Sequence, residues 1–322
     1  MRAGKAIGVF AALLCSVSAP AAASAPAAYV LQSGHIDLAI GPDGNTVILD
    51  ASEGLVAVDT GRHASHAEAI LAHARAVGKP VAAVVNTHWH LDHTTGNRDV
   101  LAAYPRARLV ATSAVKGALI GFLAEAPARA RARADDVALP DDERARARRT
   151  LAALEDRTAL VPQQPIMADG PVELGGRRIE LRVAHAAATE ADLWLLAHDE
   201  KLAVVGDLVV APVPFFDTGC ERGWREALDD IAAAEWTTLI PGHGAPMTRA
   251  DFSRWRGAFE TWLACAASDR PAAQCAEGWM RDADGFYALD EAQGVRMFAE
   301  AYVTEVLRAP ASERMAYCSA RN

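Results

Sequence analysis

Cysteine is scarce in this sequence, which has five among 322 residues. None has the C-x-x-C spacing of a thiolate metal site, so any metal ligands should be histidine and aspartate. Cys265 and Cys275 are close in sequence, which favours pairing them and leaves Cys220 to bond Cys318 near the C-terminus. The sequence alone allows three pairings of these four cysteines, and free buried thiols are the alternative.

A basic excess is also missing. The formal net charge is −9, and removal of Arg2 and Lys5 with an N-terminal leader changes it to −11. An acidic chain without a clear basic face is a poor candidate for nucleic-acid binding. The one arginine-rich stretch, residues 129–149, is interleaved with acidic residues, which predicts a solvated, salt-bridged helical face.

The first residues have the pattern of a secretory signal. Basic residues precede a short apolar run at positions 7–14, and small residues follow. That run is too short to remain as a stable membrane anchor. Cys15 allows a lipoprotein alternative, but Leu14 stands where a small residue is expected. We expect a signal peptide over residues 1–23, export across the inner membrane and, in a Gram-negative host, a periplasmic location.

Four metal-ligand side chains fall within six residues: His88, His90, Asp92 and His93. They follow an apolar run at 81–85 that predicts a strand. Because strand side chains alternate, His88 and His90 can point the same way from the end of that strand, with the other two on the following turn. Histidines also collect at strand ends without binding metal, but this ligand density exceeds what composition predicts. Imidazoles and a carboxylate suit zinc or a similar divalent ion.

Three further blocks accompany this motif. A D-T-G turn at Asp59 follows two strand-like runs, a later apolar run contains Asp207, and another ends in a P-G-H-G turn at His243. Together the four blocks resemble the metallo-β-lactamase superfamily, in the family's order, across residues 28–248. Any one block is a weak signal, and their combination is a strong one.

The resemblance implies an α/β fold, a four-layer αββα metallo-β-lactamase sandwich over residues 24–248. A turn at 42–45 favours hairpin strands at its start. Residues 113–160 are rich in alanine and arginine and predict a helical insertion of two or three helices that overhangs the site. Residues 249–322 are expected to form a C-terminal helical extension.

The resemblance also implies a metal site for two Zn²⁺ ions, with Fe or Mn as alternatives. His88 and His90 would hold the first ion. Asp92, His93 and His243 would hold the second ion, and Asp207 would bridge the two. Asp92 is the candidate catalytic residue, because it can accept and return a proton beside the attacking water. Asp59 is expected to orient a ligand histidine, or simply to begin the turn before Gly61.

One position departs from the family pattern. The first metal's third histidine usually lies four residues before an aspartate, as H-T-x-x-D, and here that segment begins with Ala188 and ends with Asp192. His185, three residues earlier, is our candidate replacement after a shift of the loop. Glu190 is a second candidate, and a first site with only two histidines is the remaining alternative.

Two aromatic features near the motif have two interpretations each. Trp89 either packs beside the site or forms one wall of its pocket. Phe215 and Phe216 follow the Asp207 strand, and such a loop either lines an apolar substrate pocket or packs in the core.

The implied activity is hydrolysis of a small ester, thioester, lactone or lactam by a metal-bound hydroxide. Export disfavours a cytosolic glutathione thioesterase, and Asp207 resembles the glyoxalase II-like branch more than the secreted β-lactamases. The nearest resemblance is to periplasmic hydrolases of sulfur-oxidation and quinoprotein-relay systems. A non-catalytic metal-binding or sensing protein on the same fold is the alternative, because Ala188 replaces the third histidine. The oligomeric state cannot be deduced from the sequence.

Overall fold

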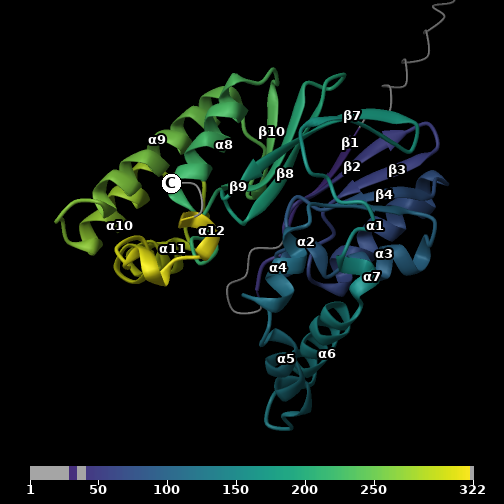
Figure 1. Ribbon diagram of the computed structural model, residues 1–322, viewed down its shortest axis with the longest axis horizontal. Helices are drawn as coiled ribbons and strands as arrows, with labels where there is room; N and C mark the ends of the chain where they lie inside the picture. Colours follow the sequence, from purple (N-terminus) through teal and green to yellow (C-terminus); the bar gives the residue numbers. More distant parts are fainter. Residues whose placement is uncertain (1–28, 35–40, 320–322) are drawn as a thin grey trace, which may run out of the picture.

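The computed structural model describes residues 29–34 and 41–319, and Figure 1 shows their arrangement. Two five-stranded sheets face each other, and helices cover the outer face of each. The expected signal peptide, with Cys15, lies outside the described residues. In the part of the chain that is described, no helix is long and apolar enough to cross a membrane.

The first sheet has the strand order β1-β2-β3-β4-β5. Its first three strands pair antiparallel, whereas β3, β4 and β5 are parallel. In β2, Val47 and Leu49 face the second sheet and Ile48 faces the outer helices, because successive strand side chains point to opposite faces. The strands are β1 (Tyr29–Gln32), β2 (Thr46–Ala51), β3 (Gly54–Val58), β4 (Val81–Val85) and β5 (Arg108–Val110).

The second sheet has the order β10-β9-β8-β7-β6. Only β9 and β10 are parallel in it, and the remaining pairs of these described strands are antiparallel. All of β9 is buried, as its continuous apolar sequence predicts. The strands are β6 (Gly170–Leu174), β7 (Arg177–His185), β8 (Ala191–Ala197), β9 (Leu202–Val210) and β10 (Thr238–His243).

Apolar packing joins the layers. Val85 and Val204 belong to the core between the two sheets. Ile70 and Val100 pack the helices α1 and α3 on the first sheet, and Trp224 packs α8 on the second. These helices, with the short helix of the metal motif, are α1 (Ala64–Val77), α2 (Leu91–Thr94), α3 (Asn97–Ala103) and α8 (Glu221–Ala233). The αββα architecture confirms the predicted fold class.

Four helices occupy the stretch expected to be a helical insertion. They are α4 (Ala114–Ile120), α5 (Ala126–Asp135), α6 (Asp141–Glu155) and α7 (Arg157–Leu160). Helices α5 and α6 form a hairpin that projects from the sandwich (Figure 1). Ion pairs such as Arg131–Glu155 and Arg133–Glu143 join them. The arginine-rich stretch is therefore an ion-paired, solvated face, as its interleaved charges predict.

The described chain after residue 248 is helical. It contains α9 (Arg249–Ala266), α10 (Ala272–Asp282), α11 (Ala292–Ala301), a π-helix (Tyr302–Leu307), a 3-10 turn (Ala311–Glu313) and α12 (Ala316–Ser319). Disulfides join Cys265 to Cys275 and Cys220 to Cys318, which confirms the predicted pairing. The second bond ties α12 to the start of α8, so the end of the chain is attached to the sandwich (Figure 1).

The predicted hairpin strands β1 and β2 pair, but residues 42–45 do not form the predicted turn. β1 and β2 are antiparallel, and the described residues 41–45 before β2 lie at the edge of the sandwich. The Gly44 N–H donates to the carbonyl of Asp92 at 2.9 Å, and the Asn45 N–H donates to that of Gly242 at 2.7 Å. The segment therefore links the metal-motif helix to the end of β10, and these backbone partners lie too far along the chain for local turn signals to reveal.

Asp43 is buried in this segment and fixes the start of α1. Its carboxylate accepts hydrogen bonds from the backbone N–H groups of Arg62 at 2.5 Å and His63 at 2.8 Å, and the Nδ1 of His63 lies 2.9 Å away. Burial favours the neutral carboxyl, but the His63 side chain and the two N–H groups outweigh it and lower the pKa of Asp43 to about 2.

We expect Asp43→Asn to lower the free energy of unfolding at pH 7 by roughly 2 kcal/mol, the size typical of hydrogen bonds to a charged group. Because the folded-state pKa of about 2 lies below the ordinary value of 3.8, this stabilisation is complete above pH ~4 and is lost as the pH falls through about 2. Urea unfolding of both proteins at pH 7 and pH 3 measures the difference. A difference that grows at the lower pH would contradict this account.

Candidate metal centre

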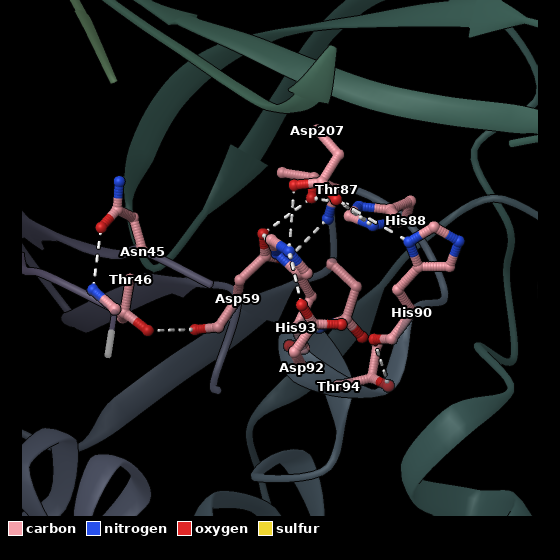
Figure 2. Close-up of polar contacts among 12 residues, drawn as sticks. Asn45, Thr46, Asp59, Thr87, His88, His90, Asp92, His93, Thr94 and Asp207 are labelled. Atoms are coloured by element: carbon pink, nitrogen blue, oxygen red, sulfur yellow. Dashed lines mark hydrogen bonds and ion pairs between the residues drawn. The ribbon is translucent and has the colours of Figure 1, made fainter. Parts of the chain in front are cut away.

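The residues after β4 bring the metal motif to one edge of the sandwich. His88 and His90 lie in a loop, and Asp92 and His93 lie on α2. The sequence predicts that these two histidines point the same way from the end of a strand. This prediction is wrong, because both lie in the loop after it. Instead the loop directs both rings toward the carboxylate of Asp207, as Figure 2 shows.

Asp207 and His243 come from the second sheet. Asp207 lies within β9, and His243 is the last residue of β10. Gly206 has a φ of 52°, and a Cβ atom there would lie 2.5 Å from the Oγ1 of Thr87. A Cβ atom at Gly242 would lie 2.0 Å from the Oδ1 of Asp207. Glycine at these two positions is what allows the strands and the motif loop to approach so closely.

Six buried side chains form two groups with metal-ligand geometry: His88, His90 and Asp207; and Asp92, His93 and His243. Within each group the donor atoms lie within 4.8 Å of one another. The Oδ2 of Asp207 is 3.5 Å from the Nε2 of His88. Its Oδ1 is 3.1 Å from the Nε2 of His93 and 3.5 Å from that of His243. One carboxylate oxygen therefore faces each group.

Asp59 fixes the ring orientation of two histidines, His93 directly and His88 through Thr87. Its Oδ2 lies 2.7 Å from the Nδ1 of His93 and accepts the Thr87 hydroxyl at 2.7 Å. A carboxylate cannot donate, so Thr87 gives its only hydroxyl hydrogen to Asp59 and accepts the Nδ1–H of His88, which lies 3.0 Å away. The Nε2 atoms of His88 and His93 are thereby left facing the carboxylate of Asp207 (Figure 2).

Thr218 fixes the ring of His90. Its Oγ1 donates to the carbonyl of Ala188 at 2.8 Å and lies 3.0 Å from the Nε2 of His90. Because the hydroxyl's one hydrogen goes to that carbonyl, His90 must donate its Nε2–H and keep a lone pair on Nδ1. The Nδ1 atom is the one that faces Asp207, 3.8 Å from its Oδ2. Tyr317 on α12 in turn donates its hydroxyl to the carbonyl of Thr218 at 2.7 Å.

We expect Thr218→Val to weaken metal binding about 10- to 100-fold, the range typical when an outer hydrogen bond to a ligand is lost. The valine keeps the shape of the side chain but leaves the tautomer of His90 unset. Thr218→Ser keeps the hydroxyl and serves as the matched control, with affinity near that of the unaltered protein. Competition with a chromogenic chelator measures the Kd for zinc, and equal affinities for the two variants would contradict the assignment.

Several buried donor atoms are suited to a divalent metal. Among the described residues, the Nε2 of His88 and the Oδ1 of Asp207 are buried without a hydrogen-bond partner. The Nε2 atoms of His93 and His243 lie 3.2 Å apart, an arrangement that a shared cation would stabilise. Imidazole nitrogens and carboxylate oxygens are the donors that zinc takes in catalytic sites. The residues present therefore fit divalent metal ions.

The charges in the centre reinforce one another. Burial favours the neutral carboxyl, but His93 and His243 outweigh it and hold the pKa of Asp207 well below its ordinary value. His243 and His93, with a smaller contribution from Arg62, likewise lower the pKa of Asp92 against the effect of burial. Burial lowers the pKa of His93, but the charges of Asp207 and Asp59 outweigh it and raise that pKa well above its ordinary value. The carboxylates are thus kept ionised, as metal ligands must be, and the positive charge that they favour on His93 is one that a bound cation would supply in place of the proton.

The structure does not bring His185 into either group. It is the last residue of β7, where it pairs with Ala191 of β8, and its side chain is exposed. Ala188, at the position of the family's third histidine, is only 1% exposed. The loop between them is closed by its own backbone bond from Ala186 to the exposed Glu190 at 2.9 Å. In the described residues, both donor groups are thus formed without His185 or Glu190.

A cavity of ≈ 370 Å³ opens on the two groups, and Asp92, Asp207 and His243 line it. Trp89 forms one wall, with its ring 4.6 Å from that of His90. The sequence left two roles for the phenylalanines after β9, lining the pocket or packing in the core, and each residue has one of them. Phe215 lines the cavity, with its ring 5.1 Å from that of His90, whereas Phe216 is buried in the core against Trp224.

Residues 40–243 match the family model described as the metallo-beta-lactamase superfamily. The chain belongs to the metallo-β-lactamase superfamily. A solved metallo-β-lactamase family protein from Thermus thermophilus has a similar fold, with a TM-score of 0.57 at 17% sequence identity. The match covers 86% of this chain and 93% of the other. At this identity the likeness shows the fold.

Two curated proteins are similar to parts of this superfamily member. A linear primary-alkylsulfatase from Pseudomonas sp. (strain ATCC 19151) is 24% identical over 225 residues, which cover 62% of this chain and 41% of the alkylsulfatase. A hydroxyacylglutathione hydrolase from Synechococcus sp. (strain JA-2-3B'a(2-13)) is 39% identical over 59 residues, 18% of this chain and 23% of the hydrolase. The chain therefore spans less than half the length of either curated relative.

Proposed function

We propose that this superfamily member is an exported, metal-dependent hydrolase with two zinc ions that cleaves a small ester, thioester, lactone or lactam. The observation that carries the proposal is the placement of Asp207 between two donor groups that face one cavity. Two metals about 3.5–4 Å apart are a recurring arrangement in hydrolytic enzymes. Iron and manganese are the alternatives to zinc, since both accept the same donors.

The ligand set follows from the ring nitrogens that face Asp207. The first ion would take the Nε2 of His88 and the Nδ1 of His90, and the second would take Asp92, His93 and His243. Asp207, which faces both donor groups, would be a ligand shared by the two ions. When bound, such ions lower the pKa of water toward roughly 7 and stabilise negative charge on the substrate.

Asp92 is the residue that we assign to proton transfer. It lines the cavity, and its Oδ2 lies 3.2 Å from the Nε2 of His243. The Nη2 of Arg62 lies 3.6 Å from the other oxygen, Oδ1. His243, with a smaller contribution from Arg62, therefore holds the carboxylate ionised and in place, so that Asp92 can accept a proton from the attacking water and return it to the leaving group.

Aromatic rings limit the access of water to the first donor group. Trp89 and Phe215 both contact the ring of His90, and both line the cavity. A site with less water strengthens the electrostatic interactions inside it and leaves fewer competing reactions. This arrangement favours a substrate that displaces water from the cavity.

The bond that the enzyme would cleave is inferred from the chemistry of the donor groups and from the curated relatives. Ester, thioester, lactone and lactam carbonyls all suit attack beside two divalent ions. The alkylsulfatase among the relatives adds alkyl sulfate esters to the bonds worth testing. A panel that contains one substrate of each type separates these alternatives.

A non-catalytic metal-binding or sensing protein is the second candidate, and one observation favours it. The first group has two histidines and a shared aspartate, and Ala188 stands where the family has a third histidine. Such a site is expected to hold its metal more weakly than a complete one. Metal binding without turnover on the whole panel would favour this candidate.

The disulfides support export. Cys220–Cys318 and Cys265–Cys275 both lie in the described part of the chain, and structural disulfides persist in oxidising compartments. We therefore propose a periplasmic location for a Gram-negative host, reached through the leader at residues 1–23. Fractionation of cells that express the full chain, followed by N-terminal sequencing, tests both the compartment and the cleavage site.

The hydrolase proposal is tested by removal and return of the metal. Turnover on the substrate panel should be lost after dialysis against a chelator and restored by zinc, iron or manganese, with the most effective ion identifying the native one. Circular dichroism of the metal-free protein checks that the fold persists. Full activity after complete removal of metal, or no activity on any substrate when loaded, would overturn the proposal.

A further inference from the structure

We propose that the substrate carries an apolar chain or ring of about six to ten carbon atoms, held between the helical insertion and the C-terminal helices. This inference rests on the proposed function for the reacting bond, but it concerns a different part of the cavity. Its evidence is the composition of the cavity walls.

Three separate segments supply those walls. Phe122 and Leu123 come from the turn after α4, Val213 and Phe215 come from the loop after β9, and Phe298 comes from α11. Intervening rings join these segments. The ring of Phe122 lies 5.6 Å from that of Trp89, and the rings of Trp89 and Phe215 both contact the ring of His90. The ring of Tyr302 lies 6.2 Å from that of Phe215 and 6.5 Å from that of Phe298.

Polar groups are confined to one end of the cavity. Its polar lining residues are Arg62, His90, Asp92, Asp207, His243 and Tyr302. The first five belong to or adjoin the donor groups, and the Tyr302 hydroxyl donates to the Oδ2 of Asp217 at 2.9 Å. The cavity is therefore reactive and charged at its floor and apolar along its walls, which is the pattern of a site for an amphiphilic substrate.

The size of the cavity sets the length of the apolar group. Its volume is ≈ 370 Å³. A cavity of roughly 150 Å³ lined by apolar side chains holds one benzene molecule. On that scale the whole cavity holds about fifteen carbon-sized atoms. The reacting group occupies the part beside the donor groups, which leaves room for about six to ten carbon atoms, and longer chains would extend past the mouth.

Two phenylalanines at the mouth are the specificity-determining residues of this proposal. Phe122 is 40% exposed and Phe298 is 38% exposed, yet both line the cavity. Each has an exposed apolar neighbour on the same segment that does not line it, Ile120 beside Phe122 and Met297 beside Phe298. These neighbours provide matched controls for substitutions that place a charge at the mouth.

The proposal is tested first by binding, without turnover. Isothermal titration of the metal-loaded protein with 1-hexanol, 1-octanol and 1-decanol should give a Kd that falls about threefold to fourfold per methylene group. Phe298→Asp should raise the Kd for 1-decanol about tenfold, because an aspartate in the apolar wall must be desolvated. Met297→Asp should leave it within about twofold. A Kd that is independent of chain length, or equal effects of the two variants, would overturn the proposal.

A turnover series separates this inference from the proposed function. Methyl esters from acetate to decanoate keep the leaving group constant, and a pH-stat follows the acid released. A kcat/KM that rises with chain length and falls in Phe298→Asp supports both ideas. Length-dependent binding of alkanols without hydrolysis of these esters or of any other substrate on the panel overturns the function and leaves the apolar site standing. Hydrolysis that is indifferent to chain length overturns the inference and leaves the function standing.

Discussion

Replacing Asp92 by alanine is expected to lower kcat by about 10²- to 10⁴-fold, the usual contribution of a positioned proton-transfer group. Asp92 lines the cavity and lies within 3.2 Å of His243, so its loss removes both the proton acceptor and one donor of the second group. Turnover on the best substrate of the panel measures the effect. Rates equal to those of the unaltered protein would contradict the proposed mechanism.

A second substitution at Asp92 and a control at Asp99 test this assignment. Asp92→Asn keeps the size of the side chain but removes the basic oxygen, and we expect it to be almost as inactive as the alanine variant. Asp99→Ala is the control, because Asp99 on α3 forms an ion pair with Arg149 outside the donor groups. It should keep normal turnover. Metal content measured on each variant shows how much of the loss follows from a weakened second site.

Replacing Cys220 and Cys318 together by serine is expected to lower the free energy of unfolding by about 3–5 kcal/mol. The bond closes a loop with a sequence separation of 98, and constraint of the unfolded chain grows with loop length. The C-terminal helices should also open from the sandwich more easily, because α12 loses its covalent attachment. Unfolding by urea, followed by circular dichroism under oxidising conditions, measures the loss.

The other disulfide provides the comparison. Cys265 and Cys275 are separated by only 10 residues, so their double serine variant should be destabilised by about 2 kcal/mol less. An equal or larger loss in this second variant would contradict the loop-length argument. The binding of 1-decanol should weaken in the Cys220/Cys318 variant, since α11 carries part of the cavity wall.

The architecture could be predicted from the sequence because the signals for its strands are local. The apolar run before His88 forms β4 at residues Val81–Val85, and the run around Asp207 forms β9. Both are continuous because the strands are buried on both faces, which a single sequence reveals directly. The cysteine pairing was also correct, since few residues separate Cys265 from Cys275 and this left one further pair.

The arrangement around the donor groups depends on contacts that no local signal carries. Thr218 lies 128 residues from His90 in sequence, and nothing in its surroundings marks it as that histidine's hydrogen-bond partner. Thr87 was inside the quoted motif, but its role depends on Asp59, which is 28 residues away. Arg62 follows the D-T-G turn closely, and its position beside Asp92 appears only when the loops are folded.

His185 illustrates the limit of reasoning from spacing. The departure at Ala188 made a shifted loop attractive, because His185 lies only three residues away. In the structure the backbone of His185 continues the pairing of β7 with β8, and this pairing holds the residue at the end of the strand. The backbone hydrogen bonds between β7 and β8 therefore determine where His185 lies, and the spacing of metal ligands in the sequence does not.

The metal-to-protein ratio tests the central claim most directly. Elemental analysis of the purified, metal-loaded chain should give about two ions per chain, as expected for two donor groups that share a carboxylate. Asp207→Ala should reduce the ratio to one or fewer, because both groups lose a donor, whereas His185→Ala should leave it unchanged. A ratio of one or fewer in the unaltered protein, or a loss of metal in His185→Ala, would contradict the account.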